Sequence, residues 1–272
     1  MALVEVQGYA FAAFRTMAEL ALRRGEPDGA CAHWRDKADR LRLAVEERFW
    51  VEELGTYALA LDGRGRPCRV RASNAGHLLF VGLPTPERGR RVAEGLLGSS
   101  LNSGWGLRTL GALQPRYNPM SYHNGSVWPH DTAICAAGIA RYGLRDGAAA
   151  LLSGMFQAAV RLDMRLPELF CGFARRPGEP PIAYPVACLP QAWAAGSVFM
   201  MLQACLGLAV DGWGHALRIE QPRLPVGIDQ LTIRRLVLGD AAVDVTFRRL
   251  GSQVAVYPEG ADRAAVPITV TV

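Results

Sequence analysis

Segments with apolar residues at helical spacing fill most of the first 210 residues, and these segments come in pairs. The pattern predicts helices over residues 3–24, 28–50, 74–81, 85–97, 130–143, 146–162 and 190–208. Short turns and long loops alternate between the helices. This connectivity is typical of a toroid built from helical hairpins, and a generic helical bundle fits it almost as well.

The pattern changes near residue 215, where short alternating runs are broken by Gly-Asp and Gly-Ser pairs. Period-two alternation interrupted by turn residues predicts three or four antiparallel strands. We therefore expect a mainly α protein with two parts, a helical part over residues 1–210 and a small β-rich part over residues 211–272.

Length and composition limit the classes of protein that fit. The chain has 272 residues, enough for one large domain or a domain with an appendage. Its longest apolar stretch, 192–208, is shorter than the roughly 18 residues of a membrane span and contains Gln203. The start of the chain lacks the pattern of a signal peptide. The net charge of +5 comes from scattered arginines without a continuous basic strip. We expect a cytoplasmic protein with neither a membrane nor a nucleic-acid partner.

Two long loops carry most of the residues suited to binding carbohydrate. Sugar faces stack on Trp and Tyr, and sugar hydroxyls need directional hydrogen-bond partners. The loop before the helix at 130 offers Trp105, Arg108, Tyr122, His123, Asn124, Trp128, His130 and Asp131. The loop that leads into the helix at 190 offers Glu168, Phe170, Tyr184, Gln191 and Trp193. Because each loop precedes a helix, both are placed to lie on one rim of a helical array.

Asp131 and Glu168 are the best pair of carboxylates for glycoside hydrolysis. An inverting glycosidase holds its two carboxyl groups roughly 6.5–9.5 Å apart, with a water between base and sugar. Asp131 follows Pro129 at a helix start, where a carboxylate also serves as a cap, so both roles stay open. Glu168 lies in the apolar sequence LPELF, where a buried carboxylate costs free energy unless it is paired.

The sequence predicts no metal site and no cofactor. His123 and His130 are seven residues apart, which differs from the four-residue spacing of a helical metal-binding pair. The six cysteines include no CxxC pair, which favours reduced, packed thiols over disulfides or zinc.

Several longer stretches resemble one known family. YNPMSYHNGSVWPHDTAICAAGIARYG, LPELFCGF and YPVACLPQAWAAGS resemble the C-terminal half of bacterial amylo-alpha-1,6-glucosidase (glycogen-debranching-enzyme-like) proteins. LVEVQGY, SNAGHLL and SGWGLRTL, earlier in the chain, fit the same family in the same order. The resemblance implies a partial (α/α)6 six-hairpin toroid with its active site in a funnel at one end. It also implies an inverting glycosidase that acts on alpha-glucans or alpha-glucosides.

The same resemblance assigns roles to particular residues. It implies that Glu168 is the general base, which activates the water. It implies a substrate-lining role for Gln7, Tyr9, Tyr122, His123, Asn124, Trp128 and His130, and places Gln191 and Trp193 at the helix after the base loop. The general acid is expected in an upstream motif of the type FGRDS, which this sequence lacks. Asp131 is then an alternative acid only if the chain is active alone. We expect a truncated hydrolase that is weak or inactive and whose toroid an upstream polypeptide completes.

Two other functions remain open. A non-catalytic carbohydrate-binding or partner-completing module would keep the aromatic residues Tyr122, Trp128 and Trp193 without the acid. A sugar epimerase or isomerase would use His123 and His130 as its acid and base, and Glu168 would then have no role.

Overall fold

The computed structural model describes residues 1–260 and 263–271. In this part of the chain seven α-helices lie at the predicted places, with ends that differ by no more than two residues: α1 (Val4–Arg23), α2 (Asp28–Arg48), α3 (Asn74–Val81), α4 (Pro86–Leu97), α5 (Pro129–Arg141), α6 (Arg145–Arg161) and α7 (Ala192–Leu206). The start of α4 illustrates the local chemistry. Thr85 Oγ1 accepts a hydrogen bond from Arg88 N at 3.4 Å, and Pro86 stands in the first turn, where its missing N–H costs nothing.

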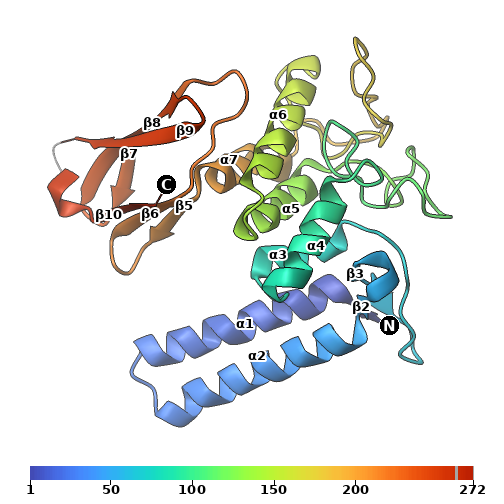
Figure 1. Ribbon diagram of the computed structural model, residues 1–272, viewed down its shortest axis with the longest axis horizontal. Helices are drawn as coiled ribbons and strands as arrows, with labels where there is room; N and C mark the ends of the chain where they lie inside the picture. The colour runs from blue at the N-terminus through green and yellow to red at the C-terminus, as the bar shows by residue number, and fades with distance from the viewer. Residues whose placement is uncertain (261–262, 272) are drawn as a thin grey trace.

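The helices form two layers (Figure 1). α1, α3, α5 and α7 pack side by side in that order, and α2, α4 and α6 each pack against the helix that precedes them in the chain. The row is open, with α1 and α7 at its two ends. This arrangement is consistent with part of a six-hairpin fold, and the described helices do not close into a ring.

Glycines let α3 and α5 approach closely at the middle of the row. A Cβ atom on Gly138 would lie 2.6 Å from Leu79 Cβ and 2.7 Å from Phe80 N, so no larger residue fits without moving a helix. Gly76 faces Cys135 across the same contact. The interface is apolar and fully buried, with Leu78, Leu79 and Ile139 at 0% exposure.

Short strands tie the N-terminal helices to the connection after α2. β1 (Ala2–Leu3) pairs antiparallel with β4 (Ala60–Leu61), and β2 (Trp50–Val51) pairs antiparallel with β3 (Thr56–Tyr57). A 3-10 helix, Glu52–Leu54, forms the turn between β2 and β3. The β1–β4 pairing holds the start of α1 against the connection between α2 and α3.

The β-rich region is more elaborate than the sequence predicted. Six described strands, β5 (Leu208–Asp211), β6 (Ala216–Glu220), β7 (Gln230–Leu238), β8 (Ala241–Leu250), β9 (Gln253–Glu259) and β10 (Ile268–Thr271), form two three-stranded sheets in the orders β10-β6-β5 and β7-β8-β9. The prediction of a wholly antiparallel region is wrong for one pair, because β10 runs parallel to β6. The 3-10 helix Arg263–Ala265 precedes β10.

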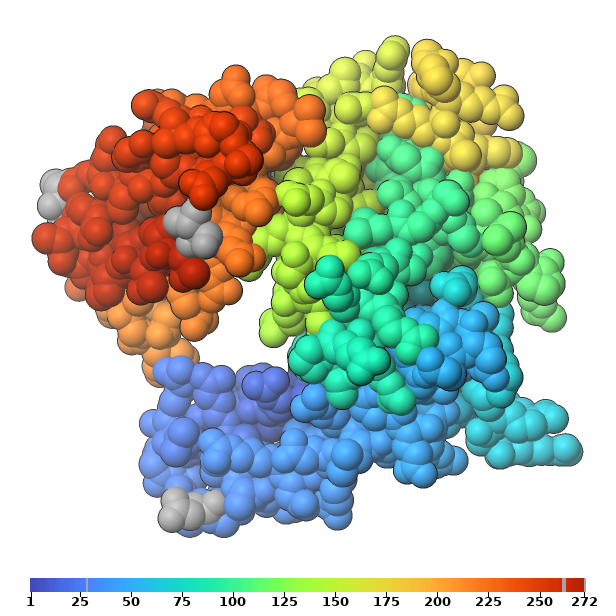
Figure 2. Space-filling model, viewed as in Figure 1, coloured from blue at the N-terminus to red at the C-terminus, as the bar shows by residue number. Residues whose placement is uncertain are grey.

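A second hydrophobic core lies within this region. Leu217, Ile219, Val245 and Phe247 are buried in it, and Leu206 at the end of α7 joins the same cluster. The space-filling view shows an opening between this region and the α1–α2 hairpin (Figure 2). No helix among the described residues has both the length and the apolar character needed to cross a lipid bilayer.

Candidate functional site

The loop before α5 is a tight turn held by its own side chains. Trp128 Nε1 donates to the Tyr122 carbonyl oxygen at 3.2 Å and to Ser126 Oγ at 3.0 Å. Ser126 Oγ donates to the same carbonyl oxygen at 2.7 Å. Gly125 has a φ of 142°, a conformation that glycine adopts at little cost. Pro129 then begins α5, so the aromatic rings are fixed at the mouth of a buried helix.

A reciprocal pair of backbone hydrogen bonds is among the contacts that join this loop to the loop before α7. Val127 N donates to the Phe170 oxygen at 2.9 Å, and Phe170 N donates to the Val127 oxygen at 3.0 Å. Both residues are fully buried. The bridge brings Glu168 beside Tyr122, although 46 positions separate the two residues in the sequence.

Glu168 is a buried carboxylate with defined partners. The Tyr122 hydroxyl donates to Oε1 at 2.7 Å, and Cys188 N donates to Oε2 at 3.5 Å. The hydrogen bond to Glu168 is the main cause that raises the pKa of Tyr122 to about 12. The phenol therefore keeps its proton at ordinary pH and remains a donor that orients the carboxylate.

Aromatic rings from both loops gather next to Glu168. Tyr122 contacts Trp128 at a centroid distance of 4.9 Å and Tyr184 at 5.6 Å. His130 contacts Trp128 at 5.6 Å and Trp193 at 5.3 Å. Such a group offers flat apolar faces edged by polar atoms, the surface that pyranose rings need.

A cavity of about 450 Å³ opens beside Trp128 and His130, and Glu168, Tyr122, Tyr184 and Trp193 lie outside its lining. It is lined by the predicted residues Tyr9, His123, Asn124, Trp128, His130 and Asp131, and also by Glu5, Leu59, Ala72, Ser73, Asn74, His77, Thr109 and Leu110. Its volume and mixed lining suit a small polar ligand such as one or two sugar units.

His130 lies within electrostatic reach of both candidate carboxylates. Burial lowers the pKa of His130 most, the charges of Asp131 and Glu168 raise it, and the net shift is downward. His130 Nδ1 is buried and has no hydrogen-bond partner among the described residues. A neutral imidazole at the cavity wall is thus available to hydrogen-bond a ligand.

Eight of the lining residues were not predicted from the sequence, and His77 is the one that bonds to two predicted residues. Its Nε2 lies 2.7 Å from Asp131 Oδ1, and its Nδ1 lies 2.6 Å from the Tyr9 hydroxyl. A single histidine in an apolar helix is usually a packed residue, so only its contacts, 54 and 68 positions away in the chain, reveal the connection.

The His77–Asp131 contact behaves as an ion pair. Burial alone would lower the pKa of His77, but the hydrogen bond and charge of Asp131 outweigh burial and raise it. Burial alone would raise the pKa of Asp131, but the hydrogen bond and charge of His77 outweigh burial and lower it. An ionised carboxylate in this setting is unsuited to act as a general acid.

His77, Asp131 and Cys135 have ligand-type atoms within 4.8 Å of one another, the spacing of a possible metal site. The hydrogen bonds argue for a different arrangement, because both ring nitrogens of His77 already have partners. Cys135 Sγ donates to the Ser73 oxygen at 3.4 Å, and burial raises the Cys135 pKa well above its ordinary value. A thiol that keeps its proton is a poor metal ligand.

Four predicted substrate contacts have other partners in the structure. Gln7 Nε2 donates to the Leu3 oxygen at 3.2 Å, and Gln191 Oε1 accepts from the N–H that follows it, at the start of α7. Trp105 is buried beneath the Arg175 guanidinium, which lies 4.4 Å from its ring centroid. These residues lie outside the lining of the 450 Å³ cavity.

Arg108, the fourth, is 2% exposed and clamps loop backbone. Its Nε donates to the Gly172 oxygen at 2.6 Å, and a terminal nitrogen donates to the Ser99 and Ser100 oxygens at 2.9 and 3.2 Å. Arg108 therefore holds the loop before α5 against the loop before α7 through backbone oxygens.

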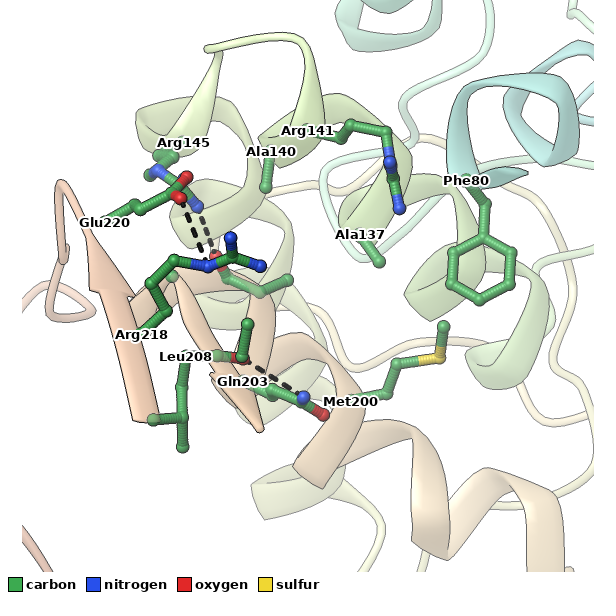
Figure 3. Close-up of a pocket in the computed structure, with 13 residues that line it drawn as sticks. Phe80, Ala137, Ala140, Arg141, Arg145, Met200, Gln203, Leu208, Arg218 and Glu220 are labelled. Atoms are coloured by element: carbon green, nitrogen blue, oxygen red, sulfur yellow. Dashed lines mark hydrogen bonds and ion pairs between the residues drawn. The ribbon is translucent and has the colours of Figure 1, made fainter. Parts of the chain in front are cut away.

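A second cavity, of about 430 Å³, lies between the helices and β6 (Figure 3). Glu220 lies 3.7 Å from both Arg145 and Arg218, and Gln203 donates to the Leu208 oxygen at 3.1 Å. Arg145 Nε is buried there without a hydrogen-bond partner among the described residues, and none of the predicted site residues lines this cavity.

The family of the chain follows from these features together with the comparisons. The helical hairpins of this chain have the fold of part of a six-hairpin glycosidase. The model of the mannosylglycerate hydrolase MGH1-like glycoside hydrolase domain matches residues 1–170. The chain belongs to this family.

Solved glycosidases share the fold at low sequence identity. The GH63 mannosylglycerate hydrolase from Thermus thermophilus in complex with glucose is 21% identical, with a TM-score of 0.56 over 73% of this chain and 46% of that one. Neutral trehalase from Saccharomyces cerevisiae is 15% identical, with a TM-score of 0.57 over 73% and 37%. The GH78 rhamnosidase of Bacillus sp. GL1 is 16% identical, with a TM-score of 0.67 over 99% and 26%.

The chain spans less than half the length of each of these structures. Among curated proteins, none matches it.

Proposed function

We propose that the chain is the base-bearing part of an inverting glycoside hydrolase that acts on alpha-glucosides or alpha-glucans, with Glu168 as the general base. The observation that most supports this proposal is the position of Glu168. Its carboxylate accepts a hydrogen bond from Tyr122 at 2.7 Å, and Tyr122 packs against aromatic rings from both loops. In this reaction the carboxylate removes a proton from a water molecule, and the water attacks the anomeric carbon as the glycosidic bond breaks. The amylo-alpha-1,6-glucosidase specificity rests on the motif resemblance.

The general acid must come from elsewhere. A glycosidase acid needs a raised pKa so that it carries a proton to the leaving oxygen. Asp131 has a lowered pKa and is bonded to His77, which supports an acid supplied by a segment outside residues 1–272. We therefore propose that this chain by itself binds sugar and hydrolyses it poorly.

The test combines calorimetry and hydrolysis on one panel of sugars. Maltose, isomaltose, trehalose and mannosylglycerate cover the resemblance and the substrates named for the solved relatives. We expect binding of an alpha-glucoside without robust turnover by the purified chain. Robust turnover would overturn the missing-acid proposal, and Asp131→Asn would then show whether Asp131 is the acid. Absence of binding to the whole panel would overturn the carbohydrate function.

A second candidate, a partner-completing module, is favoured by the face of α1 that points away from the core. Val6, Met17 and Leu20 lie on this face with exposed fractions of 52%, 42% and 36%. Monomeric proteins rarely leave a contiguous apolar stripe of this kind uncovered. We propose that helices of a further segment, supplied by the same or another polypeptide in the cytoplasm, cover α1 and the exposed Phe199 of α7.

A further inference from the structure

A chain of two hydrogen bonds runs from the cavity into the interior. The Tyr9 hydroxyl lies 2.6 Å from His77 Nδ1, and His77 Nε2 lies 2.7 Å from Asp131 Oδ1. Tyr9 is 41% exposed, His77 is largely covered and Asp131 is 8% exposed, so exposure falls along the chain. α1, α3 and α5 each contribute one residue, so packing of the three helices fixes the geometry.

We propose that Tyr9 recognises a hydroxyl group of the bound sugar, and that His77 and Asp131 are positioning residues that set whether the Tyr9 hydroxyl donates or accepts. This inference rests on the proposed carbohydrate function. Three observations carry it: all three residues line the 450 Å³ cavity, both contacts have hydrogen-bond length, and Asp131 lies at the buried end.

The protonation state of His77 decides the direction of the hydrogen bonds. When His77 is neutral with its proton on Nε2, it donates to Asp131, and Nδ1 accepts the Tyr9 proton. The Tyr9 oxygen then accepts from a sugar hydroxyl. When His77 is protonated, Nδ1 donates to the Tyr9 oxygen, and the Tyr9 proton is free to point at a sugar oxygen.

The groups that face His77 act on this equilibrium in opposite directions. Asp131 on α5 and Glu5 on α1 favour the protonated imidazole, and burial opposes it. His130, also on α5, is electrostatically coupled to His77 and disfavours a second positive charge. Tyr9 itself stays protonated, because burial and the charge of Asp131 raise its pKa. Cys135, the remaining titratable neighbour of Asp131, is a neutral thiol.

The experiment measures maltose binding by calorimetry from pH 5 to pH 9. The variants are Tyr9→Phe and His77→Gln, with Tyr257→Phe as the matched control because that tyrosine is 40% exposed on β9, outside the cavity. Tyr9→Phe should weaken maltose binding about tenfold, the usual effect of losing one hydrogen bond to a polarised group. Wild-type affinity should change with pH as His77 titrates, and both variants at the site should flatten that pH profile. The Tyr257→Phe variant should match the wild type.

The outcomes separate this inference from the function on which it rests. If wild-type protein binds maltose and Tyr9→Phe binds it equally at every pH, the inference is overturned and the carbohydrate function stands. If the wild type binds none of maltose, isomaltose and trehalose, the alpha-glucoside function falls and the inference falls with it; if it binds isomaltose or trehalose only, the same variants are compared with that sugar. Circular dichroism of His77→Gln checks that its helices remain, and Tyr9→Phe, which keeps the ring, gives the result if that variant fails to fold.

Discussion

At the scale of single residues, the hydrogen bond between Tyr122 and Glu168 has a measurable signature. The Glu168 carboxylate accepts a hydrogen bond from the phenol, and this bond is the largest cause that raises the pKa of Tyr122 to about 12, ahead of burial and of the negative charge of Glu168. Glu168→Gln keeps the shape of the side chain and removes the charge. We expect the pKa of Tyr122 to fall toward its ordinary value of 10.0. Carbon NMR of labelled tyrosine rings measures this shift, and an unchanged value would contradict the contact.

The His77–Asp131 pair makes stability depend on pH in two windows. The pKa of His77 is raised in the folded state, so its contribution is complete below 6.5 and is lost as pH rises through the folded pKa. The pKa of Asp131 is lowered, so its contribution is complete above 3.8 and is lost as pH falls through the folded pKa. Both contributions are present together between these values.

Urea unfolding across that range tests the pair. The free energy of unfolding of the wild type should exceed that of Asp131→Asn most between pH 3.8 and 6.5. The difference should shrink as pH rises above 6.5. A difference that stays constant at every pH would mean that the pair carries no charge.

Residue types in the loop before α5 predicted five of the fourteen residues that line the cavity, because sugar-binding chemistry needs Trp, His, Asn and carboxylate groups at accessible positions. His77 was not predictable in this way. Its role comes from packing of α1, α3 and α5, which a local sequence pattern does not contain. Arg108 was expected to contact substrate, but its N–H groups donate to backbone carbonyl oxygens of the loops. The spacing of residues in the sequence does not reveal these partners.

At the scale of elements, the close crossing of α3 and α5 predicts an asymmetric response to glycine substitution. Gly138→Ala would place a methyl group 2.7 Å from the Phe80 backbone nitrogen. We expect the free energy of unfolding to fall by about 1–3 kcal/mol, the usual cost of overpacking.

Gly196→Ala on α7 is the matched control, because nothing lies within 4 Å of the added methyl group. Its better helix propensity should raise the free energy of unfolding by about 0.5–1 kcal/mol. Chemical denaturation measures both changes. Equal effects of the two substitutions would contradict the tight helix crossing.

Helix positions were predictable because apolar spacing, caps and glycine stops act within a few residues. The topology of the β-rich region was not, since the parallel pairing of β10 with β6 joins segments about 50 positions apart. β5 was not predicted from the sequence, for a local reason. It follows Gly207, whose φ of 59° ends α7, and its apolar residues continue the helical pattern without a break.

At the scale of the whole molecule, the exposed face of α1 should accept charged side chains without loss of stability. Leu20→Lys combined with Met17→Lys should leave the free energy of unfolding within about 0.5 kcal/mol, because neither residue packs in the core. Binding of a hydrophobic dye should fall, since these residues belong to an apolar stripe. Val237→Lys, at an exposed position on β7, should change dye binding less. A large loss of stability in the α1 variant would mean that the face is already covered.

We propose that the loops before α5 and α7, which meet at the Tyr122–Glu168 hydrogen bond, together form one carbohydrate site. A crystal structure of the chain grown with maltose tests this claim most directly. We expect a glucose ring in the 450 Å³ cavity, against the Trp128 ring and with a hydroxyl group at the Tyr9 oxygen. We expect its anomeric end to point out of the cavity toward Glu168, which lies outside the cavity lining and is held by Tyr122. Maltose bound elsewhere, with this cavity holding only solvent, would contradict it.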